Sequence, residues 1–378
     1  MPSPKKRSGS ISLQPPRRSR RLADLDEGTS QKSTLSALSS NLDAGEVWSE
    51  IYQNAKDRAT NYTPAKRSND GKLTSLLLAL LEWLPQEGKE SVAKDINEAK
   101  TDDALWEVFQ NLVTGLLRPM KARTSTNNSI TPSPHSHRRS NSEIVASTLT
   151  EAQSRDDRFR QNCLRRDGDR CVISKSMSVD AWTELGRPAD VRSTFVEAAH
   201  IIPFSYASWD KSSAAPTGIA DTWEVLFRCF PAVRRTGLQA ETINELYNGL
   251  TLERNLHLVF GDFRIAFVAT VETPHQYKVK AYPSCPTDIL QQLPKDMLVQ
   301  FEKAKGAERL PLPDPACLDC HYRLAEILNA SAMGDYIDKK LKDWRDLKGS
   351  TGPGHLSANG STEITELLQV AFWESVAG

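Results

Sequence analysis

The sequence predicts an α+β fold, and three observations lead to that prediction. Apolar residues recur at helical spacing through residues 44–121. Two alternating segments, 264–270 and 277–282, are separated by a short turn, which is typical of a β-hairpin. Residues 194–199 resemble a strand, and Pro203 takes the chain out of the sheet just after it. Separate helices and small antiparallel sheets together define the α+β class.

Residues 1–40 are expected to form a disordered tail. The 378-residue chain has a formal net charge of zero, yet residues 1–24 are strongly basic, with one acid, Asp24, against Lys5, Lys6, Arg7, Arg17, Arg18, Arg20 and Arg21. Two basic clusters in a polar segment are typical of a nuclear-import signal, and a solvated tail in a cytoplasmic protein is the alternative.

Residues 44–121 are predicted to be a helical region with three amphipathic stretches. These are centred on Val47–Tyr52, Leu73–Leu84 and Leu105–Leu117. Pro85 is expected to end the second helix, and Thr101 supplies a capping side chain for the third. Their apolar faces are interpreted as core, with a groove for a protein partner as the less favoured alternative.

Residues 122–142 are predicted to be a flexible linker, because Ser, Thr, Asn, Pro and His dominate them and no apolar period is present. His135 and His137 could bind a metal, but solvated histidines are the more ordinary reading of a polar tract. After the linker, a helix is expected from about Glu143 to Asp167.

The region from residue 143 to residue 345 is predicted to be the second folded part. Trp209, Trp223 and Phe227 indicate a helix within the insertion 205–247. A C-terminal helix is expected from about Ala316 to Leu328, with a continuation to Trp344 as an option. Residues 346–378 are expected to be a flexible tail with a short helix.

Neither a signal peptide nor a membrane span is expected. The N-terminus lacks an apolar run, and the longest one in the chain, residues 76–81, is far too short to cross a bilayer. A soluble intracellular protein with six reduced cysteines follows as the expectation. Cys317, Cys320 and His321 match the haem c attachment pattern, but their apolar helical context favours packing, and a zinc site would need two further ligands.

Two short runs carry the functional signal: AAHIIP at residues 198–203 with His200, and NGLTLERNLH at residues 248–257 with Asn248 and His257. Read in order they give His, Asn and His. This composite resembles the HNH endonucleases, in the branch with AHIIP, over about residues 155–345. The resemblance implies a β-β-α-metal (His-Me finger) nuclease core, surrounded here by helices and the hairpin.

The resemblance also implies the role of each residue. His200 would be the general base that deprotonates water, since a neutral imidazole can accept a proton at cell pH. Asn248 would hold the loop that carries the base, and His257 would bind a divalent metal, Mg²⁺ or Mn²⁺. The implied substrate is a phosphodiester of nucleic acid, DNA more than RNA, and no membrane partner is expected.

Two positions depart from the family pattern. Many relatives have an acid directly before the base, where this chain has Ala199. Members of the AHIIP branch often carry Asp four residues after the last His, where this chain has Gly261, with Asp262 one position later. Asp262 is expected to reach the metal if the helix ends at Gly261. A catalytically degraded module that binds nucleic acid or protein is therefore the alternative function.

A basic patch is expected beside this core. Arg165, Arg166 and Arg170, together with Arg264, are predicted to contact nucleic-acid phosphates. The alternative is that these arginines pair with neighbouring aspartates at the surface.

Overall fold

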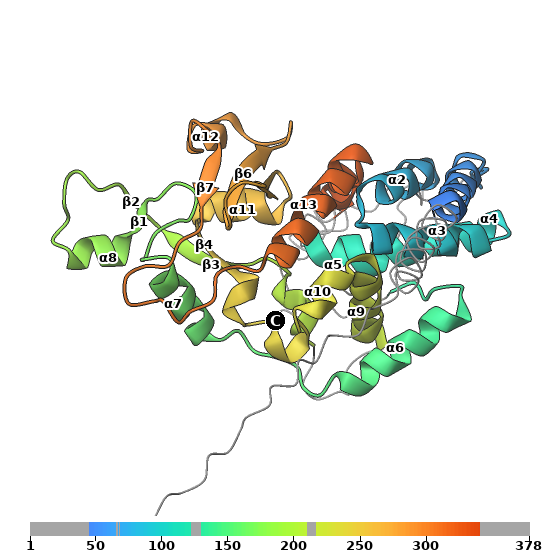
Figure 1. Cartoon of the computed structure of the whole chain (residues 1–378), viewed down its shortest axis with the longest axis horizontal. Coiled ribbons are helices and arrows are strands. Elements are labelled where there is room, and N and C mark those ends of the chain that lie inside the picture. The colour runs from blue at the N-terminus through green and yellow to red at the C-terminus, as the bar shows by residue number, and fades with distance from the viewer. Residues whose placement is uncertain (1–44, 66, 68, 122–129, 210–216, 341–378) are drawn as a thin grey trace, which may run out of the picture. The chain divides into compact units, whose positions relative to one another are not determined.

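The computed structural model describes residues 45–65, 67, 69–121, 130–209 and 217–340 (Figure 1). The chain divides into two compact units, residues 1–50 and residues 51–378. The described residues of the first unit, 45–50, are helical. In the second unit helices alternate with small sheets, so the α+β prediction is confirmed. The predicted tails, residues 1–40 and 346–378, lie outside the described residues.

Residues 51–121 form the predicted helical region. After the helical residues 51–60 come α2 (Asp70–Trp83), α3 (Gln86–Glu98), α4 (Asp102–Leu112), the π-helical segment η1 (Val113–Leu117) and α5 (Arg118–Lys121). Leu73, Leu76 and Leu80 are fully buried, because their spacing puts them on one face of α2. Thr101 begins α4 as predicted, and its Oγ1 accepts a hydrogen bond from the backbone N–H of Ala104 at 3.1 Å.

The structure corrects the predicted linker over its described part, residues 130–142. Helix α6 (Ser136–Thr148) begins inside this segment and packs along α9 (Thr217–Cys229). Arg138 is buried and donates from Nε and Nη2 to Oδ1 of Asp95, at 3.0 and 2.9 Å. A polar sequence is ordered here because charged side chains pair inside the molecule, a role that apolar periodicity does not reveal.

The predicted helix from Glu143 to Asp167 is two helices rather than one. The first, α6, ends at Thr148, and α7 (Asp157–Arg166) begins after a non-helical stretch. Asp156 starts α7, since its side chain accepts a hydrogen bond from the N–H of Arg158 at 2.8 Å. The intervening residues 149–156 are mostly polar and offer no helical face to bury.

Two antiparallel strands and a helix form the centre of the region that carries both sequence motifs. Strand β3 (Val196–His200) pairs with β4 (Gly249–Glu253), with Val196 opposite Glu253 and His200 opposite Gly249. Helix α11 (Arg254–Gly261) follows β4 directly. Around them lie β1 (Met177–Ser178), α8 (Val179–Glu184), β2 (Ser193–Thr194), η2 (Phe204–Ala207), α9, α10 (Pro231–Arg235), η3 (Ala240–Thr242) and η4 (Leu246–Asn248).

The predicted hairpin is confirmed as β5 (Ile265–Ala269) paired with β6 (Gln276–Ala281). A third strand, β7 (Leu298–Gln300), joins β6, and α12 (Thr287–Leu290) lies between β6 and β7 in sequence. The predicted C-terminal helix is α13 (Pro315–Ala330), which packs on β5 and on α2 (Figure 1). Helix α13 ends at Ala330, and Ala332 then takes a left-handed conformation with φ of 52°. Residues 333–340 form a separate helix.

All six cysteines are buried free thiols, as expected for reduced cysteines. Across the described ranges, every helix is too short or too polar to traverse a lipid bilayer.

Candidate active site

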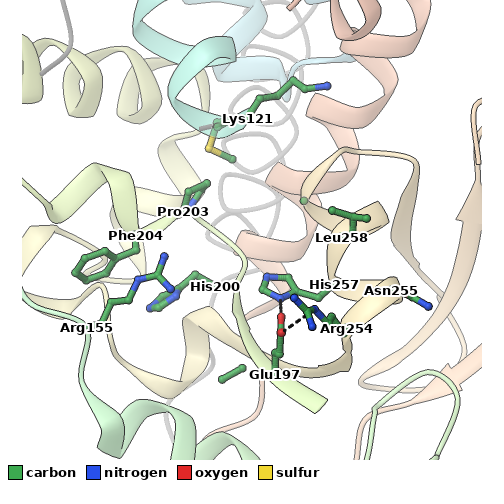
Figure 2. Close-up of a pocket in the computed structure, with 13 residues that line it drawn as sticks. Lys121, Arg155, Glu197, His200, Pro203, Phe204, Arg254, Asn255, His257 and Leu258 are labelled. Atoms are coloured by element: carbon green, nitrogen blue, oxygen red, sulfur yellow. Dashed lines mark hydrogen bonds and ion pairs between the residues drawn. The ribbon is translucent and has the colours of Figure 1, made fainter. Parts of the chain in front are cut away.

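His200 ends strand β3 and lines a pocket of about 450 Å³ (Figure 2). Its ring stacks on the ring of Phe159 from α7, with centroids 4.0 Å apart and planes inclined by 12°. Burial of the ring lowers the pKa of His200 to about 4, an effect reinforced by the positive charge of Arg155. The imidazole is therefore neutral at pH 7 and able to accept a proton.

The hydrogen bond of His200 defines which ring nitrogen is free. Nε2 of His200 lies 3.0 Å from Oδ1 of Asn244, and Nδ2 of Asn244 donates to the carbonyl of Ser154 at 3.1 Å. The bond to Ser154 orients the amide of Asn244, so that its oxygen faces the imidazole of His200. An amide oxygen can only accept a hydrogen bond. Nε2 of His200 then carries the hydrogen, and Nδ1 keeps the lone pair that a base requires.

Asn248 is fully buried and holds the segment that follows His200. Its Oδ1 accepts from the N–H of Ile202 at 2.8 Å, and its Nδ2 donates to the carbonyls of Ile202 and Ile243, both at 3.0 Å. The amide thereby satisfies both backbone groups of Ile202, where the chain leaves the strand. An Asn-Gly pair in an ordinary surface hairpin turn would not be buried in this way.

His257 projects from α11 into the same pocket and is paired with a carboxylate that the sequence motif did not reveal. Nδ1 of His257 donates to Oε2 of Glu197, on β3, at 2.8 Å (Figure 2). Oε1 of Glu197 lies 3.7 Å from Nε of Arg254. In the described part of the chain, Nε2 of His257 has no hydrogen-bond partner. An imidazole held by a carboxylate at Nδ1 presents Nε2 as a ligand atom.

Glu197 supplies the negative charge that Ala199 lacks. Ala199 is fully buried on β3, so a longer side chain there would point into the core. Glu197, two residues earlier, lines the pocket instead. Sequence reasoning missed Glu197, because only the folding of α11 against β3 brings it to His257.

Asp262 does not line the pocket of His257. Helix α11 ends at Gly261, as the sequence predicts, and Asp262 follows as its cap. Its side chain lines a neighbouring pocket with Lys121 and Arg264, and its Oδ2 lies 3.8 Å from Nε of Arg264. The early helix end turns Asp262 toward these cations.

Arg166 was predicted to contact nucleic acid, but the structure makes it a buried structural residue. It is fully buried, and its guanidinium donates twice to Asp167 and once each to the carbonyls of Leu246, Gly249 and Pro311, at 2.7 to 3.3 Å. No donor remains to face a phosphate.

The other three predicted arginines lie away from the pocket. Arg165 donates to the carbonyl of Gly306, Arg170 to that of Lys175, and Arg264 to that of Ser284. The basic side chains that do line the pocket are Lys121, Arg155 and Arg254. Sequence reasoning named neither Arg155 nor Arg254 as a contact, since only the fold brings them to the pocket.

Cys317, Cys320 and His321 are packing residues of α13, as expected. All three are buried, and the ring of His321 lies between Phe260 and Phe263, with centroids 3.8 and 4.4 Å away. Nε2 of His321 donates to the carbonyl of Phe260 at 3.0 Å. A haem would have no access to these side chains.

Residues 171–268 match the family model described as HNH endonuclease. The match contains β3, β4 and α11, and with them His200, Asn248 and His257. This segment is therefore similar to HNH endonuclease domains, a family of nucleases. The comparison with curated proteins found no match, and the comparison with solved structures found none either.

Proposed function

We propose that this protein is a metal-dependent endonuclease that hydrolyses phosphodiester bonds of DNA. The observation that carries the proposal is the pair of imidazoles in one pocket. His200 is neutral with a free Nδ1, and His257 is held by Glu197 with a free Nε2. Two strands followed by a helix support a β-β-α-metal core.

His200 acts as the general base in this proposal. Its Nδ1 takes a proton from the attacking water while Nε2 stays bound to Asn244. Asn248 holds Ile202 and so keeps the strand end that presents His200 in place. Stacking on Phe159 fixes the plane of the ring. A base held in this way loses little freedom when the substrate arrives.

His257 would hold the metal through Nε2, while Glu197 orients its ring from Nδ1. A single imidazole nitrogen fits Mg²⁺ or Mn²⁺, which keep several waters and take phosphate oxygens as ligands. The described residues contain no group of three or more His, Cys, Asp or Glu side chains arranged to hold a metal ion, which argues against a closed zinc site. When bound, the cation would stabilise negative charge on the phosphate and the leaving oxygen.

Arg155 and Arg254 are the cations that would meet the substrate backbone. Both line the pocket, and the Arg254 side chain is 76% exposed. Arginine at the rim of a site can pair with phosphates on either side of the bond to be cleaved.

The test is plasmid nicking with added Mg²⁺ or Mn²⁺, combined with a thermal melt of each variant. His200→Ala should keep metal binding while cleavage falls by roughly 10²–10⁴, the usual contribution of a general base. His257→Ala should weaken metal binding, and a high metal concentration should partly restore cleavage. Asn248→Ala should give an intermediate loss through misorientation of the base. Full activity in His200→Ala, or no metal-dependent cleavage of any nucleic acid by the wild type, would reject the proposal.

One observation favours the second candidate, a catalytically degraded module of the same fold that binds nucleic acid. The set of anionic side chains at the site is small, since Asp262 faces a neighbouring pocket and Ala199 replaces an acid. Binding of DNA that persists in EDTA, without cleavage in any metal, would support this candidate.

For localisation we propose the nucleus, on the basis of the basic clusters in residues 1–24. A fluorescent fusion without these residues should leave the nucleus and become cytoplasmic. Unchanged nuclear retention would remove the import role from the tail.

A further inference from the structure

The pocket wall opposite α11 is aromatic, and we infer from it that the site takes an unpaired nucleotide of a DNA strand, with its base stacked on Phe204. This inference rests on the proposed nuclease function and specifies its substrate class. Three features of the pocket carry it: the aromatic wall, an enclosing helix and the volume.

Phe204 provides a stacking surface next to His200. Its half-buried ring lies 5.7 Å from the ring of His200, inclined by 47°, and the guanidinium carbon of Arg155 lies 5.8 Å from its centroid (Figure 2). Pro203 extends the same wall. An aromatic ring with an arginine over it is the kind of surface on which unpaired bases stack, independent of their identity.

Helix α5 encloses the pocket from a different part of the chain. Met120 and Lys121 line it from α5, outside the segment that matches the HNH family. Oγ of Ser205 donates to the carbonyl of Pro119 at 3.1 Å, and Nζ of Lys121 lies 2.7 Å from Oδ1 of Asp338. These buried contacts fix α5 beside Phe204, so the enclosure is a feature of this chain rather than of the matched segment.

The size of the pocket favours one nucleotide over a base pair. A volume of about 450 Å³ lies within the range of sites for small ligands. A base inside a duplex would have to leave its stack and its partner to enter, at an energetic cost that an unpaired base avoids. With its base on Phe204, the phosphate of such a nucleotide would face His200, His257 and the two rim arginines.

The test compares a fluorescein-labelled single-stranded DNA oligonucleotide with the duplex of the same sequence. Binding to the full chain is measured by anisotropy in EDTA, so that cleavage does not interfere. The wild type should bind the single strand more tightly than the duplex. Phe204→Leu should weaken single-strand binding by roughly 5–150-fold, the contribution of one stacked base, and leave duplex binding nearly unchanged. Phe204→Tyr, which keeps the ring, should bind like the wild type.

Two controls separate stacking from damage to the fold. Phe195→Leu removes a ring that is 71% exposed and lies outside the pocket lining, so it should change neither affinity. Phe204→Met has nearly the side-chain volume of Phe204→Leu in a more flexible shape and also lacks the aromatic face, so it should reproduce that loss with a native thermal melt. A 2-aminopurine base in the single strand should be quenched by the wild type and by Phe204→Tyr, but not by Phe204→Met.

Tighter binding of duplex than of single strand would overturn the inference, as would an equal loss for both in Phe204→Met. Cleavage with Mn²⁺ distinguishes this failure from failure of the proposed function. Faster cleavage of duplex than of single strand rejects the unpaired nucleotide and retains the nuclease. Phe204-dependent binding of single strands without any cleavage retains the stacking site and rejects the nuclease.

Discussion

The carboxylate of Glu197 gives His257 the character of a metal ligand. A histidine that donates from Nδ1 to a carboxylate has its tautomer fixed and its Nε2 made more basic. Glu197 also lies close to Arg254, so its negative charge is balanced by an exposed cation that a phosphate could take over. One residue therefore links the proposed metal ligand to the arginine that we propose meets the substrate.

Replacement of Glu197 by Gln should weaken the site without unfolding the protein. The amide oxygen can still accept from Nδ1 of His257, but the negative charge is lost, so Mn²⁺ affinity and nicking rate should each fall by roughly 10–100-fold. Calorimetric titration with Mn²⁺ and the plasmid assay measure these effects. Glu184→Gln, at an exposed acid of α8, is the matched control. Unchanged Mn²⁺ affinity in Glu197→Gln would contradict the assignment.

The neutral state of His200 has a definite pH dependence. Burial lowers the pKa of His200 to about 4, from an ordinary value near 6.5. Between these two pH values the unfolded chain binds more protons than the folded one. The stability that the neutral ring contributes is therefore complete above pH 6.5 and is lost as the pH falls toward 4.

An NMR titration of the free protein should find the His200 midpoint near pH 4 rather than near pH 6.5. Phe159→Leu removes the ring that covers His200, so it should raise the midpoint toward the ordinary value. A midpoint near 6.5 in the wild type would show that water reaches the imidazole.

At the scale of elements, the close contact between α7 and β4 positions His200, the proposed base. Gly249 lies opposite His200 in the strand pair, and a Cβ at residue 249 would come within 2.7 Å of the sulfur of Cys163 and of the ring of Phe159. Only glycine allows α7 to approach this strand so closely. The ring of Phe159 in turn stacks on His200.

Gly249→Ala should therefore cost about 1–3 kcal/mol of unfolding free energy, the usual penalty for overpacking a core, and should displace Phe159 from His200. The comparison is Gly71→Ala, where a Cβ in α2 meets nothing within 4 Å. That substitution should stabilise the protein by roughly 0.5–1 kcal/mol through helix propensity. Urea unfolding of both variants measures the two changes in unfolding free energy. Equal changes would contradict the close approach of α7 to β4.

The sequence predicts elements well where local pattern decides them. Helices α2 and α4, the hairpin of β5 and β6, and the end of α11 at Gly261 follow from period, turn residues and glycine. The pocket residues are different, because Glu197, Arg155 and Asn244 become neighbours of the two histidines only through tertiary folding. Arg166 fails as a predicted contact for the same reason, since burial cannot be read from a run of charges.

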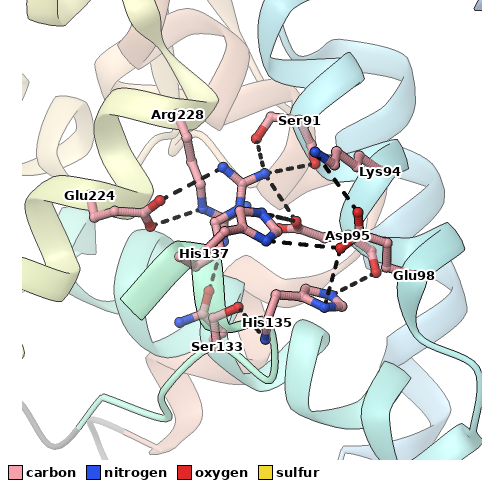
Figure 3. Close-up of polar contacts among 11 residues, drawn as sticks. Ser91, Lys94, Asp95, Glu98, Ser133, His135, His137, Glu224 and Arg228 are labelled. Atoms are coloured by element: carbon pink, nitrogen blue, oxygen red, sulfur yellow. Dashed lines mark hydrogen bonds and ion pairs between the residues drawn. The ribbon is translucent and has the colours of Figure 1, made fainter. Parts of the chain in front are cut away.

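On the scale of the whole molecule, a buried ionic network ties the helical region to the part that carries the active site. Asp95 of α3 is 1% exposed, and its carboxylate pairs with Arg138 of α6 and Arg228 of α9. Figure 3 shows Asp95 beside Arg228. Glu224 pairs with Arg228 at 3.1 Å, and Asn111 of α4 accepts from the same guanidinium at 2.7 Å. Helices α3, α4, α6 and α9 thus meet at a buried polar network. Arg138 belongs to this network, so the described part of residues 122–142 is part of the folded interior.

Removal of the central charge of this network should be far more costly than removal of a surface charge. Asp95→Asn leaves Arg138 and Arg228 buried without their shared carboxylate, so the free energy of unfolding should fall by roughly 3–5 kcal/mol. Glu87→Gln breaks the pair with Arg235, in which both side chains are more than half exposed, and should cost less than about 1 kcal/mol. Urea unfolding measures both losses. Limited trypsin digestion adds a local readout, because cleavage after Arg138 should be slow in the wild type and fast in Asp95→Asn. Rapid cleavage there in the wild type, or equal losses in the two variants, would mean that the segment around Arg138 is a linker after all.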